Sequence, residues 1–235
     1  MANPRAFKWR HYEASLILWC VRWYLQTALT YRQLEGLLAE RGLPVVHTTI
    51  MRWIHHFSPR LNRLINPYLR KTRNSWRCDE TYLKIKGKWK YLYRALDSKG
   101  DTLDFLLSNR RDKKAAKQFF KKVLGNRHVT YPYCIGVDKN AAYPAALSEL
   151  KKQNQLTLTK LRPVKYLNNI IEADHRFIKR KVRFKQWFQT FATAQKTIAG
   201  YETLNMIGKG QVKYVAANDL RVQKLFIEKL FGIAA

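Results

Sequence analysis

The chain has 235 residues, of which 46% are hydrophobic and 13% aromatic, so it can bury a substantial core and is not a disordered polymer. Its 45 lysines and arginines outnumber 16 aspartates and glutamates, which gives a net charge of +29. Because this excess is spread along the whole chain, it predicts a polyanionic partner, DNA or RNA. The three cysteines are an odd number with no CxxC pair, a pattern that supports neither a disulfide framework nor a zinc finger. No apolar run approaches membrane-spanning length, so we expect a soluble, intracellular protein without a membrane partner.

The N-terminal part of the chain predicts three helices. The second begins at Thr30, which forms a capping-box pattern with Gln33, and is expected to stop at Gly42. The third helical run is expected to end at Pro59. A helix, a glycine-containing turn and a further helix are typical of a helix-turn-helix domain. The apolar face of the first helix is predicted to comprise Leu16, Cys20, Trp23 and Thr27.

The second part of the chain changes from helical to alternating periodicity, which predicts strands. Three strand-like runs are followed by a helix capped by Asp112 and by a strand that ends at Asp138. A helix over 141–152, a short segment near 156–161 and a helix that contains Glu172 come next. This order of elements is that of a ribonuclease H-like α/β domain, a mixed sheet with flanking helices.

Two more helical runs follow, over about 190–207 and 220–232. We therefore expect a helix-turn-helix DNA-binding domain at 1–65, a ribonuclease H-like catalytic domain at 66–212 and a helical tail of unknown role at 213–235.

Two aspartates are candidates for catalysis. Asp79 alternates with Thr81, Leu83 and Ile85, the strand face that should pack inward, and a charge there is costly unless it is paired or bound to metal. The alternative is an ordinary strand residue turned to solvent. Asp138 follows an apolar strand whose carboxyl end is where ligands bind in open α/β sheets, although aspartate is also common in turns. Glu80, on the face opposite Asp79, is expected to be solvated.

Glu172 is the third candidate acid. It lies early in a basic helix, and two structural roles compete with catalysis: a capping box with Asn169 and a helical ion pair with Arg176. Asp174 lies on a different face and is the weaker candidate. The inward stripe of the helix is predicted to comprise Ile171, His175, Ile178 and Val182.

Three convergent carboxylates can hold two divalent cations against a phosphodiester. Mg²⁺ prefers hard oxygen ligands and needs only a few carboxylates, and ions roughly 3.5–4 Å apart can act on both the attacking and the leaving oxygen. Asp79, Asp138 and Glu172 are therefore the expected ligands of two Mg²⁺ ions, for which Mn²⁺ could substitute.

Two groups of residues are expected to contact DNA. Thr48, Thr49 and Arg52 open the helix that would enter a major groove, where arginine suits guanine and threonine suits base edges or phosphate. A row of cations follows Glu172; it could be a solvated face, but its position beside the acids favours contact with the DNA backbone. Its members are Arg176, Lys179, Arg180 and Arg183.

Long stretches of the chain resemble DDE transposases of bacterial insertion sequences, in particular the IS-six family. They include TYRQLEGLLAERG, WRCDETYLKIKGKWKYLYRALDSKG, VDKNAAYPAALSELK and KYLNNIIEADHRFIKR. On this resemblance the two catalytic aspartates of the family fall on Asp79 and Asp138, its glutamate on Glu172, and a cation two helical turns later on Lys179. The resemblance implies Mg²⁺ dependence, binding to terminal inverted repeats, and replicative transposition through cointegrates.

We therefore expect a transposase that first frees a 3′-hydroxyl and then directs it to attack target DNA. The expected partner is double-stranded DNA, both element ends and target, bound by a homo-oligomer that is a dimer on DNA, in the bacterial cytoplasm. Two alternatives remain: a metal-dependent DNA nuclease without strand transfer, and a non-catalytic helix-turn-helix DNA-binding regulator.

Overall fold

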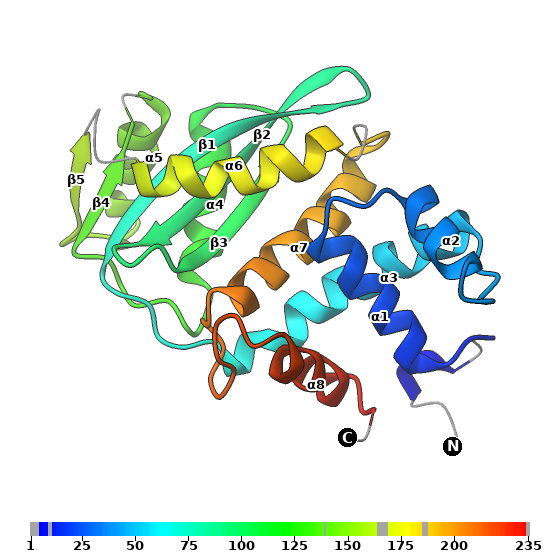
Figure 1. Cartoon of the computed structure of the whole chain (residues 1–235). Coiled ribbons are helices and arrows are strands. Elements are labelled where there is room, and N and C mark those ends of the chain that lie inside the picture. The colour runs from blue at the N-terminus through cyan, green and yellow to red at the C-terminus, as the bar shows by residue number, and fades with distance from the viewer. Residues whose placement is uncertain (1–4, 9–10, 139, 164–168, 185–187, 234–235) are drawn as a thin grey trace. The chain divides into compact units, whose positions relative to one another are not determined.

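The computed structural model describes residues 5–8, 11–138, 140–163, 169–184 and 188–233 (Figure 1). Contacts divide the chain into two compact units. The first, here called the helical unit, combines residues 1–69 with 180–235, and the second, the sheet unit, comprises residues 70–179.

The sheet unit is built on a five-stranded mixed sheet with the order β3-β2-β1-β4-β5. β1, β2 and β3 form antiparallel pairs, whereas β4 runs parallel to β1 and β5 parallel to β4. This sheet and its flanking helices confirm the predicted α/β fold with a mixed sheet. The strands are β1 (Ser75–Ile85), β2 (Lys88–Asp97), β3 (Thr102–Ser108), β4 (Cys134–Val137) and β5 (Lys160–Pro163), so the last begins later than the segment expected near 156–161.

Helices cover both faces of this sheet. α4 (Lys113–Leu124) and α5 (Ala142–Lys152) pack on one face, where apolar side chains of β1 and β2 form a core with Phe119, Phe120 and Tyr143. The other face carries Asp79 and Arg94. There the first part of α6 (Asn169–Phe184) runs along the sheet (Figure 1). Because successive strand residues point to opposite faces, neighbouring residues of β1 belong to different layers.

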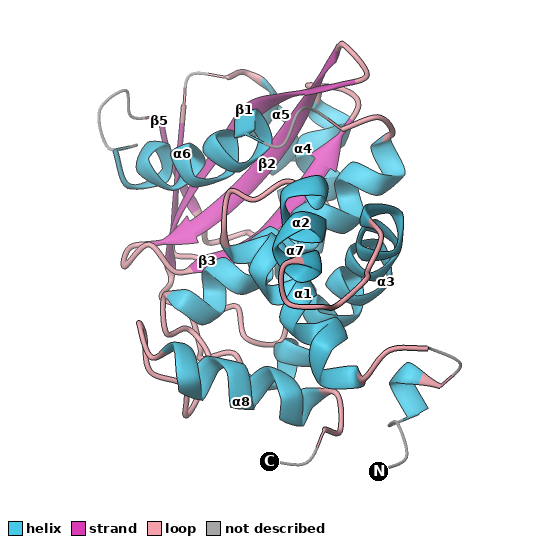
Figure 2. Ribbon diagram, turned by 45° about the vertical axis from the view of Figure 1, so that its right-hand side comes forward, coloured by secondary structure: helices cyan, strands magenta, loops and turns pink. Residues whose placement is uncertain are grey.

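The helical unit contains α1 (Ala14–Gln26), α2 (Tyr31–Ala39), α3 (His47–Ile65), α7 (Phe191–Gly208) and α8 (Leu220–Leu230). Thr30 caps α2 as predicted: its side chain accepts from the Gln33 backbone, and the Gln33 side chain accepts from the Thr30 backbone. Figure 2 shows that helices dominate this part of the chain.

Two predictions for these helices are wrong. α3 does not end at Pro59 but continues to Ile65, because its buried stripe continues through Leu61 and Ile65. In α1, Leu16 and Trp23 are only half-buried. The buried face instead follows Ala14, Ile17, Leu18, Cys20, Val21, Tyr24 and Leu25.

The compact units divide the chain differently from the expected functional domains, whose boundaries stay a prediction. We placed α7 inside a catalytic domain at 66–212, whereas its contacts are with α3 and α1, and it belongs to the helical unit. Almost every residue of α7 between Ala194 and Ile207 is buried, so the helix needs partners on all sides and finds them among other helices.

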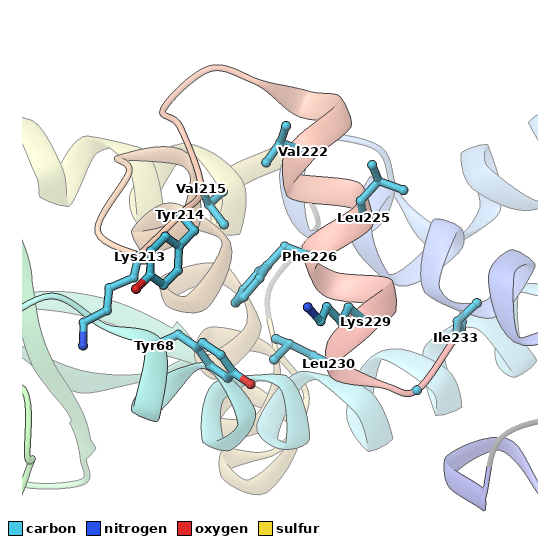
Figure 3. Close-up of a pocket in the computed structure, with 11 residues that line it drawn as sticks. Tyr68, Lys213, Tyr214, Val215, Val222, Leu225, Phe226, Lys229, Leu230 and Ile233 are labelled. Carbon is cyan, nitrogen blue, oxygen red and sulfur yellow. The ribbon is translucent and has the colours of Figure 1, made fainter. Parts of the chain in front are cut away.

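Residues 213–233 are folded as well. α8, the segment Lys213–Val215 and Tyr68 enclose a pocket of about 650 Å³, with Phe226 and Leu230 among its lining residues (Figure 3). No helix among the described residues is both long and apolar enough to cross a membrane.

Candidate active site

Two of the predicted acids lie on neighbouring strands of the sheet unit. β1 and β4 pair in parallel, with Cys78 opposite Val137, so Asp79 and Asp138 follow at the same level of adjacent strands. Asp79 is half-buried, and about a third of the Asp138 side chain (34%) is exposed. One carboxylate oxygen from each of Asp79, Glu80 and Asp138 lies within 4.8 Å of the others. The structure therefore brings the two aspartates together and adds a third acid.

Glu80 is buried, so the expectation that it is solvated is wrong. Its exposed fraction is 6%, because the face opposite Asp79 is covered by α4 and α5 rather than by water. Tyr143 Oη donates to its carboxylate at 2.6 Å, Asn140 Nδ2 donates at 2.9 Å, and Arg111 Nε also donates. Glu80 therefore ties β1 to the loop after β4, to α5 and to the segment before α4.

Arg111 connects Glu80 to the aspartate pair. Besides its bond to Glu80, its guanidinium lies 3.6 Å from the Asp138 carboxylate. The backbone N–H of Asn140 donates to Asp138 at 3.0 Å, which orients that carboxylate from the other side. Sequence reasoning missed Arg111, since a lone arginine between a strand and a helix carries no pattern of its own.

The electrostatics at Asp79 fit a cation site. Burial, followed by the negative charges of Glu80, Asp138 and Glu172, raises the pKa of Asp79 to about 7, although the backbone N–H of Glu80 donates to it at 2.8 Å and acts in the opposite direction. A divalent cation would stabilise the ionised form of a carboxylate that lies close to three other acids. The atoms available as metal ligands are carboxylate oxygens, the hard ligands that Mg²⁺ prefers. The residues present therefore fit the expected metal.

Glu172 lies in the first turn of α6 with an exposed side chain, and it is not among the acids whose oxygens meet within 4.8 Å. Its charge nevertheless helps to raise the pKa of Asp79, so it acts on the same site. Of the two structural alternatives, the described side chains include no ion pair between Glu172 and Arg176, and the Asn169 side chain lies outside the described set. Glu172 as a metal ligand stays a prediction.

The rest of α6 follows the predicted faces. The inward stripe of Ile171, His175, Ile178 and Val182 is buried, as expected. The four cations predicted to contact DNA are exposed: Arg176, Lys179, Arg180 and Arg183. Lys181 is different, because it is buried at 4% exposure and donates to the carbonyls of Leu25 and Gln26 at the end of α1.

The helical unit carries a basic concavity on α3. Thr48 and Arg52 are exposed at the start of this helix and Thr49 is half-buried. Further along, a hollow of about 490 Å³ has no acidic residue in its lining, which comprises Arg52, His55, His56, Pro59, Arg60, Arg63 and Lys196. Sequence reasoning missed Arg60 and Arg63, although their spacing from Arg52 places all three along one side of a helix.

Comparison with known proteins agrees with this geometry. A family described as a DDE domain matches residues 73–211, more than half of the chain. The chain is 37% identical over 204 residues to the transposase for insertion sequence-like element IS431mec of Staphylococcus aureus, which is 86% of this chain and 88% of that relative. The same identity and coverage relate it to the transposase for insertion sequence element IS257 in transposon Tn4003 of Staphylococcus aureus.

Two solved structures are also similar. The HTLV-2 integrase catalytic core domain in complex with magnesium (dimeric form) has a TM-score of 0.43 and 15% identity, over 58% of this chain and 88% of that one. The catalytic core domain of BIV integrase has a TM-score of 0.41 and 14% identity, over 54% of this chain and 80% of that one.

Proposed function

The chain belongs to the DDE transposases of bacterial insertion sequences, and from that premise we propose that it cuts the ends of its element and joins the freed 3′-hydroxyls to target DNA. The observation that carries this proposal is the convergence of Asp79 and Asp138 at a half-buried position where a carboxylate is hard to ionise without a cation. Replicative transposition through cointegrates by a homo-oligomer, a dimer on DNA, is the form of the reaction we propose.

The acids at this site would have two different roles, metal binding and support of the structure. Asp79, Asp138 and Glu172 would hold two Mg²⁺ ions, or Mn²⁺ in their place. Bound there, the ions supply charge stabilisation to both the attacking and the leaving oxygen of a phosphodiester. Glu80, which is already engaged by three donors, braces the site and does not bind metal. Arg111, about a third exposed at 35%, can use its remaining N–H groups to donate to a phosphate oxygen.

DNA binding would use both units. We propose that Thr48, Thr49 and Arg52 read base edges in a major groove of the inverted repeat, and that the basic concavity on α3 holds the adjacent phosphates. The exposed α6 cations, Arg176, Lys179, Arg180 and Arg183, would follow the backbone of the strand being joined, and Lys179 would position its end. In functional terms 1–65 would then recognise DNA and 66–212 would catalyse, while the role of 213–235 is open.

The proposal is tested with oligonucleotide duplexes that carry one inverted-repeat end. Asp79→Ala, Asp138→Ala and Glu172→Ala should each abolish cleavage and strand transfer, while end binding, measured by mobility shift, stays intact. Glu149→Ala is the matched control: this acid pairs with Lys113 and Lys117 on the surface of the sheet unit and should leave all three activities unchanged.

The same assay separates the alternatives. A pre-nicked end incubated with target DNA should give joined products; hydrolysis without joining would instead show a nuclease. A wild-type protein that binds ends but neither cuts nor joins them in Mg²⁺ or Mn²⁺ would show a regulator. Normal cleavage by Asp79→Ala would refute the assigned site.

A further inference from the structure

A fully buried arginine lies beside the candidate active site. Arg94 of β2 has an exposed fraction of 0%, and its guanidinium donates to the carboxylate of Asp174 on α6, whose side chain is 10% exposed. Removing two charges from water is unfavourable, and apolar residues of similar volume often give equal or greater stability. Packing alone therefore does not explain why this ion pair is here.

The position of the pair suggests what it does. Arg94 is the register partner of Asp79 across β1 and β2, and directly opposed strand residues point to the same face. Asp174 follows Glu172 by two residues on α6. The ion pair thus joins two places: the position on β2 directly opposite Asp79, and the turn of α6 that contains Glu172.

The other contacts given for that turn among the described residues are apolar. Ile171 and Ile178 bury the helix against its neighbours, but apolar burial is non-directional and tolerates small rotations or shifts of a helix. Among the described residues, no hydrogen bond or ion pair holds the Glu172 carboxylate itself. An arginine–carboxylate bond has a defined geometry, and buried pairs of this kind are best known for fixing register.

We propose that the ion pair between Arg94 and Asp174 fixes the position of Glu172 relative to Asp79. By fixing that position, the pair determines the affinity of the site for divalent cations. This inference rests on the proposed function, because it takes Glu172 as a ligand. It also assigns Asp174 a role outside metal binding, since its carboxylate is engaged by Arg94.

The test measures Mn²⁺ binding to the full chain without DNA, from the electron paramagnetic resonance signal of the unbound ion. Two variants are compared: Asp174→Asn, and the apolar double variant Arg94→Met with Asp174→Leu. Both should weaken Mn²⁺ binding about tenfold, the lower end of what is lost when a group that orients a metal ligand is removed. The double variant should keep a near-normal melting temperature, because it leaves no charge buried without a partner.

Asp104→Asn is the matched control. It breaks another ion pair of the sheet unit, between the buried Asp104 of β3, a strand that does not pair with β1, and the exposed Lys122. Asp104→Asn should lower stability and leave Mn²⁺ binding unchanged. This result would show that a loss of stability alone does not weaken Mn²⁺ binding.

Glu172→Gln separates this inference from the proposed function. If Glu172→Gln leaves Mn²⁺ binding unchanged, the assigned ligand set is wrong. If Glu172→Gln weakens binding but the folded double variant binds Mn²⁺ like the wild type, the ligand set holds and the positioning role is overturned.

Should both test variants fail to fold, a third variant, Asp174→Glu, is used. It keeps the charge pair but displaces the helix by the length of one methylene, and it should bind Mn²⁺ more weakly than the wild type. Loss of folding in all three would show that the pair only holds the unit together, which also overturns the proposal.

Discussion

Glu80 and Asp79 are adjacent acids for which the structure predicts opposite phenotypes. Glu80 is buried and accepts hydrogen bonds from Arg111, Asn140 and Tyr143, so its oxygens have little capacity left for a metal. Asp79 accepts one backbone bond and has a pKa raised to about 7 by burial and by neighbouring acids. Substituting Glu80 should therefore affect folding, and substituting Asp79 should affect metal binding.

The magnitude for Glu80→Gln follows from its contacts. Glutamine keeps the shape and one acceptor oxygen, which can still serve Arg111 and Asn140, while Tyr143 can turn its hydroxyl to accept from the new amide. What is lost is the charge, and hydrogen bonds to a charged group are worth about 1.5–3 kcal/mol against about 1 kcal/mol for neutral ones. Since Arg111 is partly exposed, we expect a loss of about 2 kcal/mol, or about 4–8 °C in Tm for a chain of this length.

The assay combines urea denaturation with Mn²⁺ binding on the same preparations. Glu80→Gln should lose stability and, once folded, bind Mn²⁺ within about threefold of the wild type, a difference below 1 kcal/mol. Asp79→Asn should fold at least as well as the wild type and lose Mn²⁺ binding. If Glu80→Gln leaves stability unchanged and removes Mn²⁺ binding, Glu80 is a ligand and the reasoning from its hydrogen bonds fails.

Three further predictions concern pH, recognition and packing. In metal-free protein, the contribution of Asp79 to stability should fall as pH rises from about 4 to 7, because Asp79 stays protonated up to about pH 7 when folded but ionises near 3.8 when unfolded. Buried His175, whose pKa is lowered to about 3, acts in the opposite direction, so the measurement is the difference between two denaturation series in EDTA: Asp79→Asn should gain stability relative to the wild type as pH rises. Arg52→Ala should reduce the preference for inverted-repeat ends over random DNA by about 1–3 kcal/mol. Arg60→Ala should weaken binding to both kinds of DNA equally and make the salt dependence of binding shallower. If Arg52→Ala also weakened both equally, Arg52 would not read base edges in the groove. Gly200→Ala should destabilise the helical unit by about 1–3 kcal/mol, since its Cβ would lie 2.6 Å from Ser58 Oγ and 2.7 Å from Leu25; an unchanged Tm would show that α7 can shift.

Patterns of neighbouring residues in the sequence predicted many of the helices and strands. The burial of Thr81, Leu83 and Ile85 in β1, the capping box at Thr30 and the inward stripe of α6 depend on neighbours within a few residues, and all are confirmed. The order of strands and helices followed from the same periodicities. Asp79 and Asp138 could be selected because each interrupts or ends an apolar strand, a local anomaly that sequence displays directly.

The predictions that failed depend on long-range packing. Alternation correctly placed Glu80 on the face opposite Asp79, but periodicity does not say whether a face meets water, and here α4 and α5 cover it. Pro59 should end a helix by local rules, yet the burial of Leu61 and Ile65 outweighs one missing backbone hydrogen bond. α7 follows the sheet unit in sequence, but most of it is buried and its contacts are with α3 and α1, so it packs within the helical unit.

Asp79 differs from Glu80 and Asp174 in its contacts with arginine. Glu80 bonds to Arg111 and Asp174 to Arg94, so these two carboxylates already have their charge compensated within the fold. Asp79 has no such partner at bonding distance among the described residues, and the surrounding acids make its ionisation harder. Sequence alone cannot separate the two classes, because both arginines are remote from their acids along the chain. An acid that the fold leaves uncompensated either stays protonated or takes its counter-ion from outside, and in the phosphodiester chemistry that we propose that counter-ion is a metal ion.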